Sequence, residues 1–180
     1  GRKLLFGSGN DAIRLTRFAK IPQLMFFVLS AIIIFGWTRK LYGYLAALMA
    51  IFLFSFSPTV LAHSRFVTTD MPALFGVLIA TYFFLHYLEN PTGKNLWLAG
   101  IIFGLAQLTK YSVLLLIPFF LGLALIHAFL NDGLKIKASL QKLQRTALII
   151  VIGYLFVVWP VYYFHTWNYP PDLQKFHTED

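Results

Sequence analysis

The sequence predicts an all-α bundle of helices that cross a membrane. Of its 180 residues, 58% are hydrophobic and only 12% are charged, and the mean hydropathy is +0.70. Because soluble domains carry about a quarter charged residues, this balance excludes an ordinary soluble domain. Apolar runs alternate with short polar segments, so we expect a single domain over residues 1–180. It would comprise an interfacial helix within residues 1–20 and a bundle of about six transmembrane helices over residues 21–165.

Residues 1–20 are polar and basic, unlike the rest of the chain. Either Asn10 or Asp11 can cap a short helix, after which apolar residues fall on one helical face. Three cations share another face: Arg14, Arg17 and Lys20. This pattern is typical of a helix that lies in the membrane interface. The alternative is a tethering loop with scattered charges.

Six apolar runs follow in order. They span residues 21–37, 43–58, 71–88, 96–109, 113–130 and 146–164. The fourth run is short for a span of about 20 residues, which tilt, bilayer thinning or burial among other helices would accommodate. Pro118 predicts a kink in the fifth run. Four glycines are expected to allow close packing of helices: Gly100, Gly104, Gly122 and Gly153.

Polar segments separate these runs. Residues 89–94 have the composition of a turn, and residues 110–112 form a tight break. A longer polar loop is expected over residues 131–145. After the sixth run, the aromatic side chains of Tyr162, Tyr163 and Trp167 resemble an interfacial belt, and we expect an outer loop to begin near residue 166.

The distribution of lysine and arginine predicts which polar segments share a membrane face. The loops after the first, third and fifth runs carry seven of these residues, against three in the alternate loops. The N-terminal segment adds five to the second set, but an interfacial helix is not a simple translocated loop. The positive-inside rule therefore places the first set in the cytoplasm. The segment around Asp70, Lys110 and the N-terminal helix then share the outer face.

The segment His63–Pro72 is the most polar run in the middle of the chain. It holds His63, Arg65 and Asp70 in a short connection between two spans, which keeps them at a membrane face. Polar groups held at that depth often mark a functional site. A structural role competes with this reading. Pro72 suits the first turn of a helix, and Thr68, Thr69 or Asp70 can cap that helix.

Three stretches together resemble a known family. Residues 57–72 are similar to the second outer loop of the bacterial dolichyl-phosphate-mannose–protein mannosyltransferase-like enzymes. Residues 6–11 with 19–22 are similar to the juxtamembrane part of their first outer loop, and residues 104–112 to their short fifth helix and the turn after it. These enzymes are membrane glycosyltransferases of the GT-C fold, related to the lipid A aminoarabinose transferases.

The resemblance implies transfer of a sugar from a polyprenyl-phosphate donor to a protein, lipid or glycan acceptor at the outer face of the bacterial inner membrane. Family members carry a catalytic carboxylate early in the first outer loop. We expect that base to lie upstream of Gly1, and the chain to be a fragment that is inactive alone. Asp11 precedes the first run in a different sequence context.

The implied reaction assigns roles to the polar residues. Cations must stabilise the leaving lipid phosphate, and Arg65 and Lys110 are the candidates, with Arg17 and Lys20 as outer-face support. Asp70 would orient a cation or bind sugar hydroxyls, and His63 would bind phosphate or acceptor. Snorkelling of Lys110, headgroup contact by Arg65 and a structural His63 remain open as alternatives.

Other functions and partners were considered. A transporter or channel subunit, or a non-catalytic membrane scaffold, is the alternative to an enzyme. The net charge of +8 suits contact with anionic lipid, and no basic run interleaved with aromatic residues indicates nucleic-acid binding. No cofactor is expected with certainty. A divalent metal stays open, although the sequence has no paired histidines at metal-ligand spacing and no clustered carboxylates.

Overall fold

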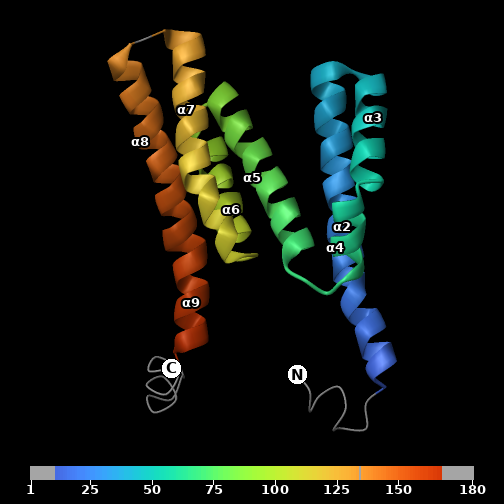
Figure 1. Ribbon diagram of the computed structural model, residues 1–180. Coiled ribbons are helices and arrows are strands. Elements are labelled where there is room, and N and C mark those ends of the chain that lie inside the picture. Colours follow the sequence, from blue (N-terminus) through green and yellow to red (C-terminus); the bar gives the residue numbers. More distant parts are fainter. Residues whose placement is uncertain (1–10, 134, 168–180) are drawn as a thin grey trace. The chain divides into compact units, whose positions relative to one another are not determined.

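A computed structural model of the chain describes residues 11–133 and 135–167 (Figure 1). In that part the regular structure is helical and includes no β-strand, which confirms the all-α class. The chain forms two compact units, Gly1–Tyr82 and Phe83–Asp180, and each is described by itself. Their boundary falls within one unbroken helix, α5 (Asp70–Glu89). The single domain stays a prediction.

The described part of the first unit begins with a long helix, α2 (Ala12–Tyr42), of 31 residues. Asp11 caps it, because its Oδ1 accepts hydrogen bonds from the backbone N–H groups of Ile13 and Arg14 at 3.0 and 3.2 Å. The helix is about 46 Å long, whereas the hydrocarbon core of a bilayer is about 30 Å thick. The described part of the expected interfacial helix is therefore continuous with the first span, and Pro22 does not break it.

Gly43 separates α2 from α3 (Tyr44–Ser55), and its φ of 87° lies in the region that favours glycine. A bend of 56° then separates α3 from α4 (Pro58–Arg65). Pro58 opens α4, where its missing N–H costs nothing. The second apolar run is thus a short helix that packs on α2 and then turns, rather than one straight span.

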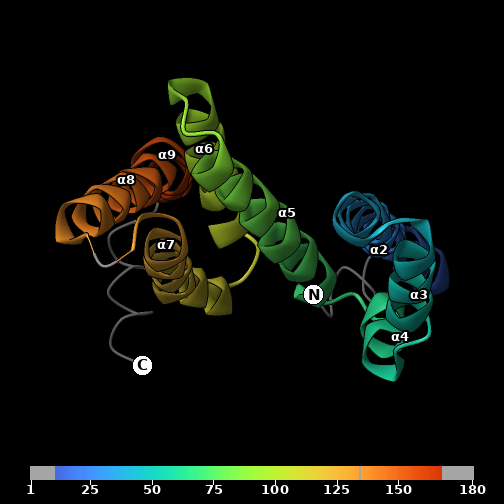
Figure 2. The ribbon, with the colours of Figure 1, turned by 90° about the horizontal axis from the view of Figure 1, so that it is seen from above.

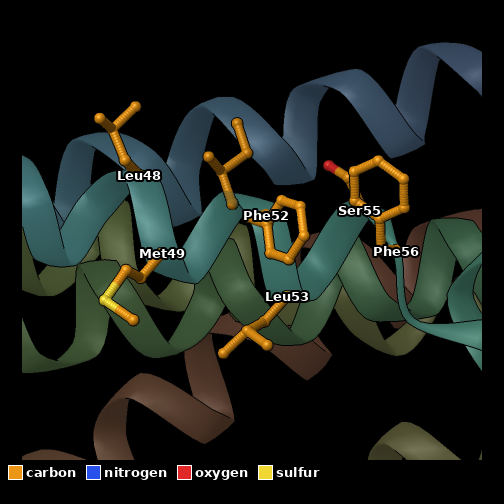
Figure 3. Close-up of a pocket in the computed structure, with 7 residues that line it drawn as sticks. Leu48, Met49, Phe52, Leu53, Ser55 and Phe56 are labelled. Atoms are coloured by element: carbon orange, nitrogen blue, oxygen red, sulfur yellow. The ribbon is translucent and has the colours of Figure 1, made fainter.

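One face of α3 is a shallow apolar hollow of about 720 Å³. Figure 3 shows the side chains that project from this part of the helix. The labelled residues are Leu48, Met49, Phe52, Leu53, Ser55 and Phe56. Because no charged residue lines the hollow, it suits contact with lipid tails and offers no chemistry of its own.

In the first unit, α5 contacts α2 through aromatic rings. The Phe26 and Phe75 rings lie 5.6 Å apart, and the Trp37 ring meets that of Tyr82 edge-on at 5.5 Å. Pro72 lies in the first turn of α5, as predicted. The N-terminal part of α5, which begins at Asp70, therefore packs against α2 within the first unit.

The described part of the second unit comprises the end of α5 and six further helical elements. Its elements after α5 are α6 (Gly93–Gln107), the 3₁₀ turn η1 (Tyr111–Leu115), α7 (Leu116–Asp132), α8 (Ile136–Gly153), the π-helical turn η2 (Tyr154–Val158) and α9 (Trp159–Thr166). Helix α8 packs on both α6 and α7 (Figure 2). The rings of Phe84, Phe103 and Phe120 are fully buried between these helices, and Phe84 stacks on Phe120 at 4.1 Å.

Glycines bring α6 and α8 into backbone contact. A Cβ added at Gly104 would lie 2.6 Å from the Gly153 carbonyl oxygen, and one at Gly100 would lie 2.6 Å from Ile152 Cγ2. Close packing is confirmed for these two glycines and for Gly153. It is wrong for Gly122, where an added Cβ would have no atom within 4 Å.

Two predictions about the second unit are corrected by the structure. Most of the expected polar loop over residues 131–145 is helical, because α8 begins at Ile136. Apolar residues at 136, 140, 143 and 147 continue the helical period, which explains the error. Pro118 lies in the first turn of α7, just after η1, so it starts an α-helix rather than kinking one.

The number of helices that can cross a membrane is smaller than the number of apolar runs. Within the described residues, four helical stretches are long and apolar enough, and a fifth is added if the bent pair of α3 and α4 counts as one span. Helix α6 has only 15 residues, in line with the short fourth run. The polytopic membrane architecture stands, with four or five spans in place of about six.

Candidate functional site

Two polar residues of the first unit meet where α4 gives way to α5. His63 Nδ1 lies 3.0 Å from Asp70 Oδ2, and the two side chains are 46% and 28% exposed. The pair is therefore solvent-accessible and able to contact a ligand. An ionised carboxylate at this distance fixes the orientation of the imidazole ring and leaves its other nitrogen available.

Local sequence explains why this pair forms. His63 falls in the last turn of α4, and Asp70 is the first residue of α5. Only four residues connect the two helices, so the two side chains face each other across a short connection. The Ala73 N–H donates to the Thr69 carbonyl at 3.0 Å, which makes Thr69 the residue that precedes the helix.

The remaining candidates of the first unit are cations at the ends of helices. Arg65 is the last residue of α4 and is exposed. Arg17 and Lys20 are exposed on the N-terminal part of α2. The structure thus brings His63 and Asp70 together. The convergence of Arg65 with Lys110 stays a prediction, because these two residues belong to different units.

Lys110 of the second unit lies in the break between α6 and η1. Its backbone is extended, with φ −160° and ψ 141°. It lines a cavity of about 370 Å³ that is the more polar of the two hollows in this part of the unit. The other lining residues are Gln107, Leu108, Thr109, Tyr111, Leu114, Tyr154, Val158 and Tyr162. One cation therefore shares this cavity with neutral hydrogen-bonding groups.

An apolar groove of about 500 Å³ adjoins this cavity. Tyr154, Val158 and Tyr162 line both spaces. The groove runs along the outer surface of α8, η2 and α9, and Val151, Leu155 and Trp159 complete its lining. A hollow that holds a cation therefore lies beside an apolar groove, and the two spaces share the side chains of Tyr154, Val158 and Tyr162.

The π-helical turn lies where these two spaces meet. Residues 154–158 form η2 directly after Gly153, the glycine packed on α6. Single π-turns within α-helices often lie at functional sites. Here the turn carries two of the three shared lining residues, Tyr154 and Val158.

Metal binding finds no support in the described part of the chain. That part has no group of three or more His, Cys, Asp or Glu side chains arranged to hold an ion.

Comparison with protein families identifies the family of this chain. The sequence profile of the dolichyl-phosphate-mannose-protein mannosyltransferase family matches residues 3–164. The chain belongs to this family. Neither the curated proteins nor the solved structures gave a match.

Membership in the mannosyltransferase family confirms the resemblance seen in the sequence. With its apolar helices, it makes the protein an integral membrane protein of a glycosyltransferase family. The matched residues include both the His63–Asp70 pair and the Lys110 cavity.

Several residues that line the Lys110 cavity were not predicted from the sequence. Tyr154 had no predicted role, Gln107 was noted only within a motif, and Tyr162 was placed in an aromatic belt. The spacing of Tyr154, Val158 and Tyr162, four residues apart, was the available signal. It marks a single face of a helix, but only the fold shows that Lys110 lies against that face.

Proposed function

We propose that the protein transfers a sugar from a polyprenyl-phosphate donor to a protein, lipid or glycan acceptor at the outer face of a bacterial plasma membrane. The observation that carries this proposal is that the Lys110 cavity and the apolar groove along α8 and α9 lie side by side and share three lining residues. Such a donor has a charged phosphate head and a long apolar chain, and these two spaces suit those two parts. Family membership supports the class of reaction.

The chemistry requires charge stabilisation beside the lipid phosphate. An acceptor oxygen attacks the anomeric carbon, the bond from that carbon to the phosphate oxygen breaks, and the lipid phosphate leaves with the electron pair. The acceptor proton passes to a carboxylate. In this proposal Lys110 and Arg65 stabilise the charge on the phosphate, while the His63–Asp70 pair binds sugar or acceptor hydroxyls.

The catalytic carboxylate is not assigned within this chain. In this proposal the carboxylate lies upstream of Gly1, as the resemblance implies. Asp70 is held by His63, so we give Asp70 a binding and orienting role.

The test replaces Lys110 with methionine in the complete protein, reconstituted in vesicles. Transfer from a polyprenyl-phosphate-linked sugar should fall by roughly tenfold to a hundredfold in kcat/KM, the usual range for loss of a charge-assisted contact of about 1.5–3 kcal/mol. Arg65→Met should act in the same direction. Sugar-free polyprenyl phosphate should inhibit the unaltered protein more strongly than the Lys110→Met protein.

Lys135→Met is the matched control, because it removes an exposed cation from the connection between α7 and α8. It should leave transfer unchanged. If Lys110→Met and Arg65→Met both retain full activity with polyprenyl-phosphate donors, the proposed phosphate site is wrong.

A further inference from the structure

The turn that carries Lys110 is closed by hydrogen bonds across the break between α6 and η1. Lys110 itself has extended backbone and belongs to neither helix. Its carbonyl accepts from the Val113 N–H at 3.0 Å. The Thr109 hydroxyl donates back to the Ala106 carbonyl at 2.6 Å. The direction in which the Lys110 side chain projects therefore depends on hydrogen bonds made by the neighbouring residues.

The Gln107 side chain makes a hydrogen bond that spans the whole break. Its Nε2 donates to the Val113 carbonyl at 3.1 Å. Val113 is 3% exposed and thus anchored in the unit. Gln107 is the last residue of α6, so this bond ties the end of α6 to the residue that also holds the Lys110 carbonyl.

The position demands a particular side chain. Gln107 lines the same cavity as Lys110 and is half-buried. A donor is required, because the partner is a carbonyl oxygen, and the side chain must reach across the six positions from 107 to 113. Methionine has comparable length and no donor, so it separates the bond from the volume.

We propose that Gln107 is a positioning residue, whose side-chain amide holds the Lys110 turn in the form that presents the Lys110 ammonium to a lipid phosphate in the cavity. This inference rests on the proposed role of Lys110. Gln107 acts on the phosphate through Lys110 and takes no part in bond making.

The experiment measures binding of sugar-free polyprenyl phosphate to the complete, detergent-solubilised protein. Gln107→Met should weaken binding about tenfold, which corresponds to about 1.4 kcal/mol. Gln107→His keeps a ring N–H donor and should restore most of that loss. Thermal unfolding of each variant shows whether it is folded.

Asn95→Leu is the matched control at the opposite end of the same helix. It removes a similar amide-to-carbonyl bond, from Asn95 Nδ2 to the Asn90 carbonyl at 2.9 Å. Binding should stay within about twofold of the unaltered protein. A loss equal to that of Gln107→Met would mean that any amide bond at an end of α6 matters, and would overturn the inference.

A double-mutant cycle distinguishes positioning from general support of the fold. Because Gln107 is inferred to act through Lys110, adding Gln107→Met to Lys110→Met should weaken binding no further. Independent, additive losses would overturn the inference while leaving the phosphate role of Lys110 intact. Unchanged binding by Lys110→Met alone is a different result, and it would remove the proposed phosphate site together with this inference.

Discussion

Asp70 occupies a position where one carboxylate serves two purposes. As the first residue of α5 it lies at the positive end of the helix dipole, where an acidic side chain stabilises the helix. Its Oδ2 also contacts His63 Nδ1 at 3.0 Å. The helix start and the orientation of His63 thus depend on the same negative charge.

Replacing Asp70 by asparagine should separate these purposes. Asparagine keeps the shape and is itself a good residue at a helix start, so the protein should fold. Loss of the charge should loosen His63 and lower sugar transfer roughly tenfold. Thr59→Val, on the exposed side of α4, should not change transfer. Full transfer by a stably folded Asp70→Asn protein would give Asp70 a purely structural role.

A second prediction concerns the two residues that cap α2 and α6. Asp11 caps α2, and the Thr92 hydroxyl oxygen caps α6 by accepting from the Asn95 N–H at 3.2 Å. Replacement of either residue by alanine should cost about 1 kcal/mol locally. Amide hydrogen exchange should then rise about fivefold at the start of the affected helix only. If neither variant changes the exchange rate at either helix start, these caps do not stabilise their helices.

At the scale of residues, the sequence predicted which side chains could carry chemistry, but it did not predict which of them contact one another. Lys110 stood out as a cation in a short break. Its neighbours in the cavity did not, because Tyr154 and Tyr162 lie more than forty positions further along the chain. His63 and Asp70 were both recognised, but their mutual contact depends on the angle between α4 and α5, which composition does not encode.

At the scale of elements, the contact between α6 and α8 depends on the absence of side chains. Gly100, Gly104 and Gly153 let the two backbones approach each other within the lipid, where packing rather than the hydrophobic effect holds helices together. The same contact fixes the end of α8 immediately before η2. Tyr154 is therefore positioned directly by this glycine interface.

Gly104→Ala should destabilise the protein by about 2 kcal/mol, because the new methyl group would collide with the Gly153 carbonyl and with Val157 Cβ. Gly122→Ala is the matched control on α7. An added Cβ there meets no atom within 4 Å, so stability should stay the same or rise slightly through better helix propensity. The free energy of unfolding in mixed detergent–lipid micelles measures both. Equal effects of the two changes would contradict the close packing.

Element boundaries were predictable where the sequence carries a local chemical signal. The turn between α5 and α6 was placed correctly from Pro, Gly and polar residues, and so was Pro72 in the first turn of α5. The start of α8 was not, because Lys135–Arg145 reads as a polar loop although its apolar positions keep a helical period. The break at Pro58 also escaped prediction, since a proline at the end of an apolar run can close one helix or open the next.

At the scale of the whole molecule, the two compact units share α5. The first unit carries the His63–Asp70 pair and the second carries the Lys110 cavity. The proposed transfer reaction needs both at one membrane face. Charge counting along the sequence supplied that expectation, and topology mapping is its direct test.

The 180 residues contain no cysteine, so single cysteines can be introduced without removing native ones. Thr69→Cys and Ser112→Cys should both react with a membrane-impermeant maleimide added to the outside of sealed, oriented vesicles. Asn90→Cys and Lys135→Cys should react only after the vesicles are opened. If Thr69→Cys and Ser112→Cys are labelled from opposite sides of the membrane, the His63–Asp70 pair and the Lys110 cavity cannot act on one donor molecule.

The π-helical turn at residues 154–158 has a consequence for comparing this protein with its relatives. A π-turn accommodates one more residue than the α-helical turn it replaces, so everything beyond it is rotated relative to Gly153 and the α6 contact. Relatives without the extra residue would align well on either side and need a one-position gap between them. Placing that gap elsewhere would pair Tyr162 with the wrong neighbour and conceal which side of the last helix faces the lysine.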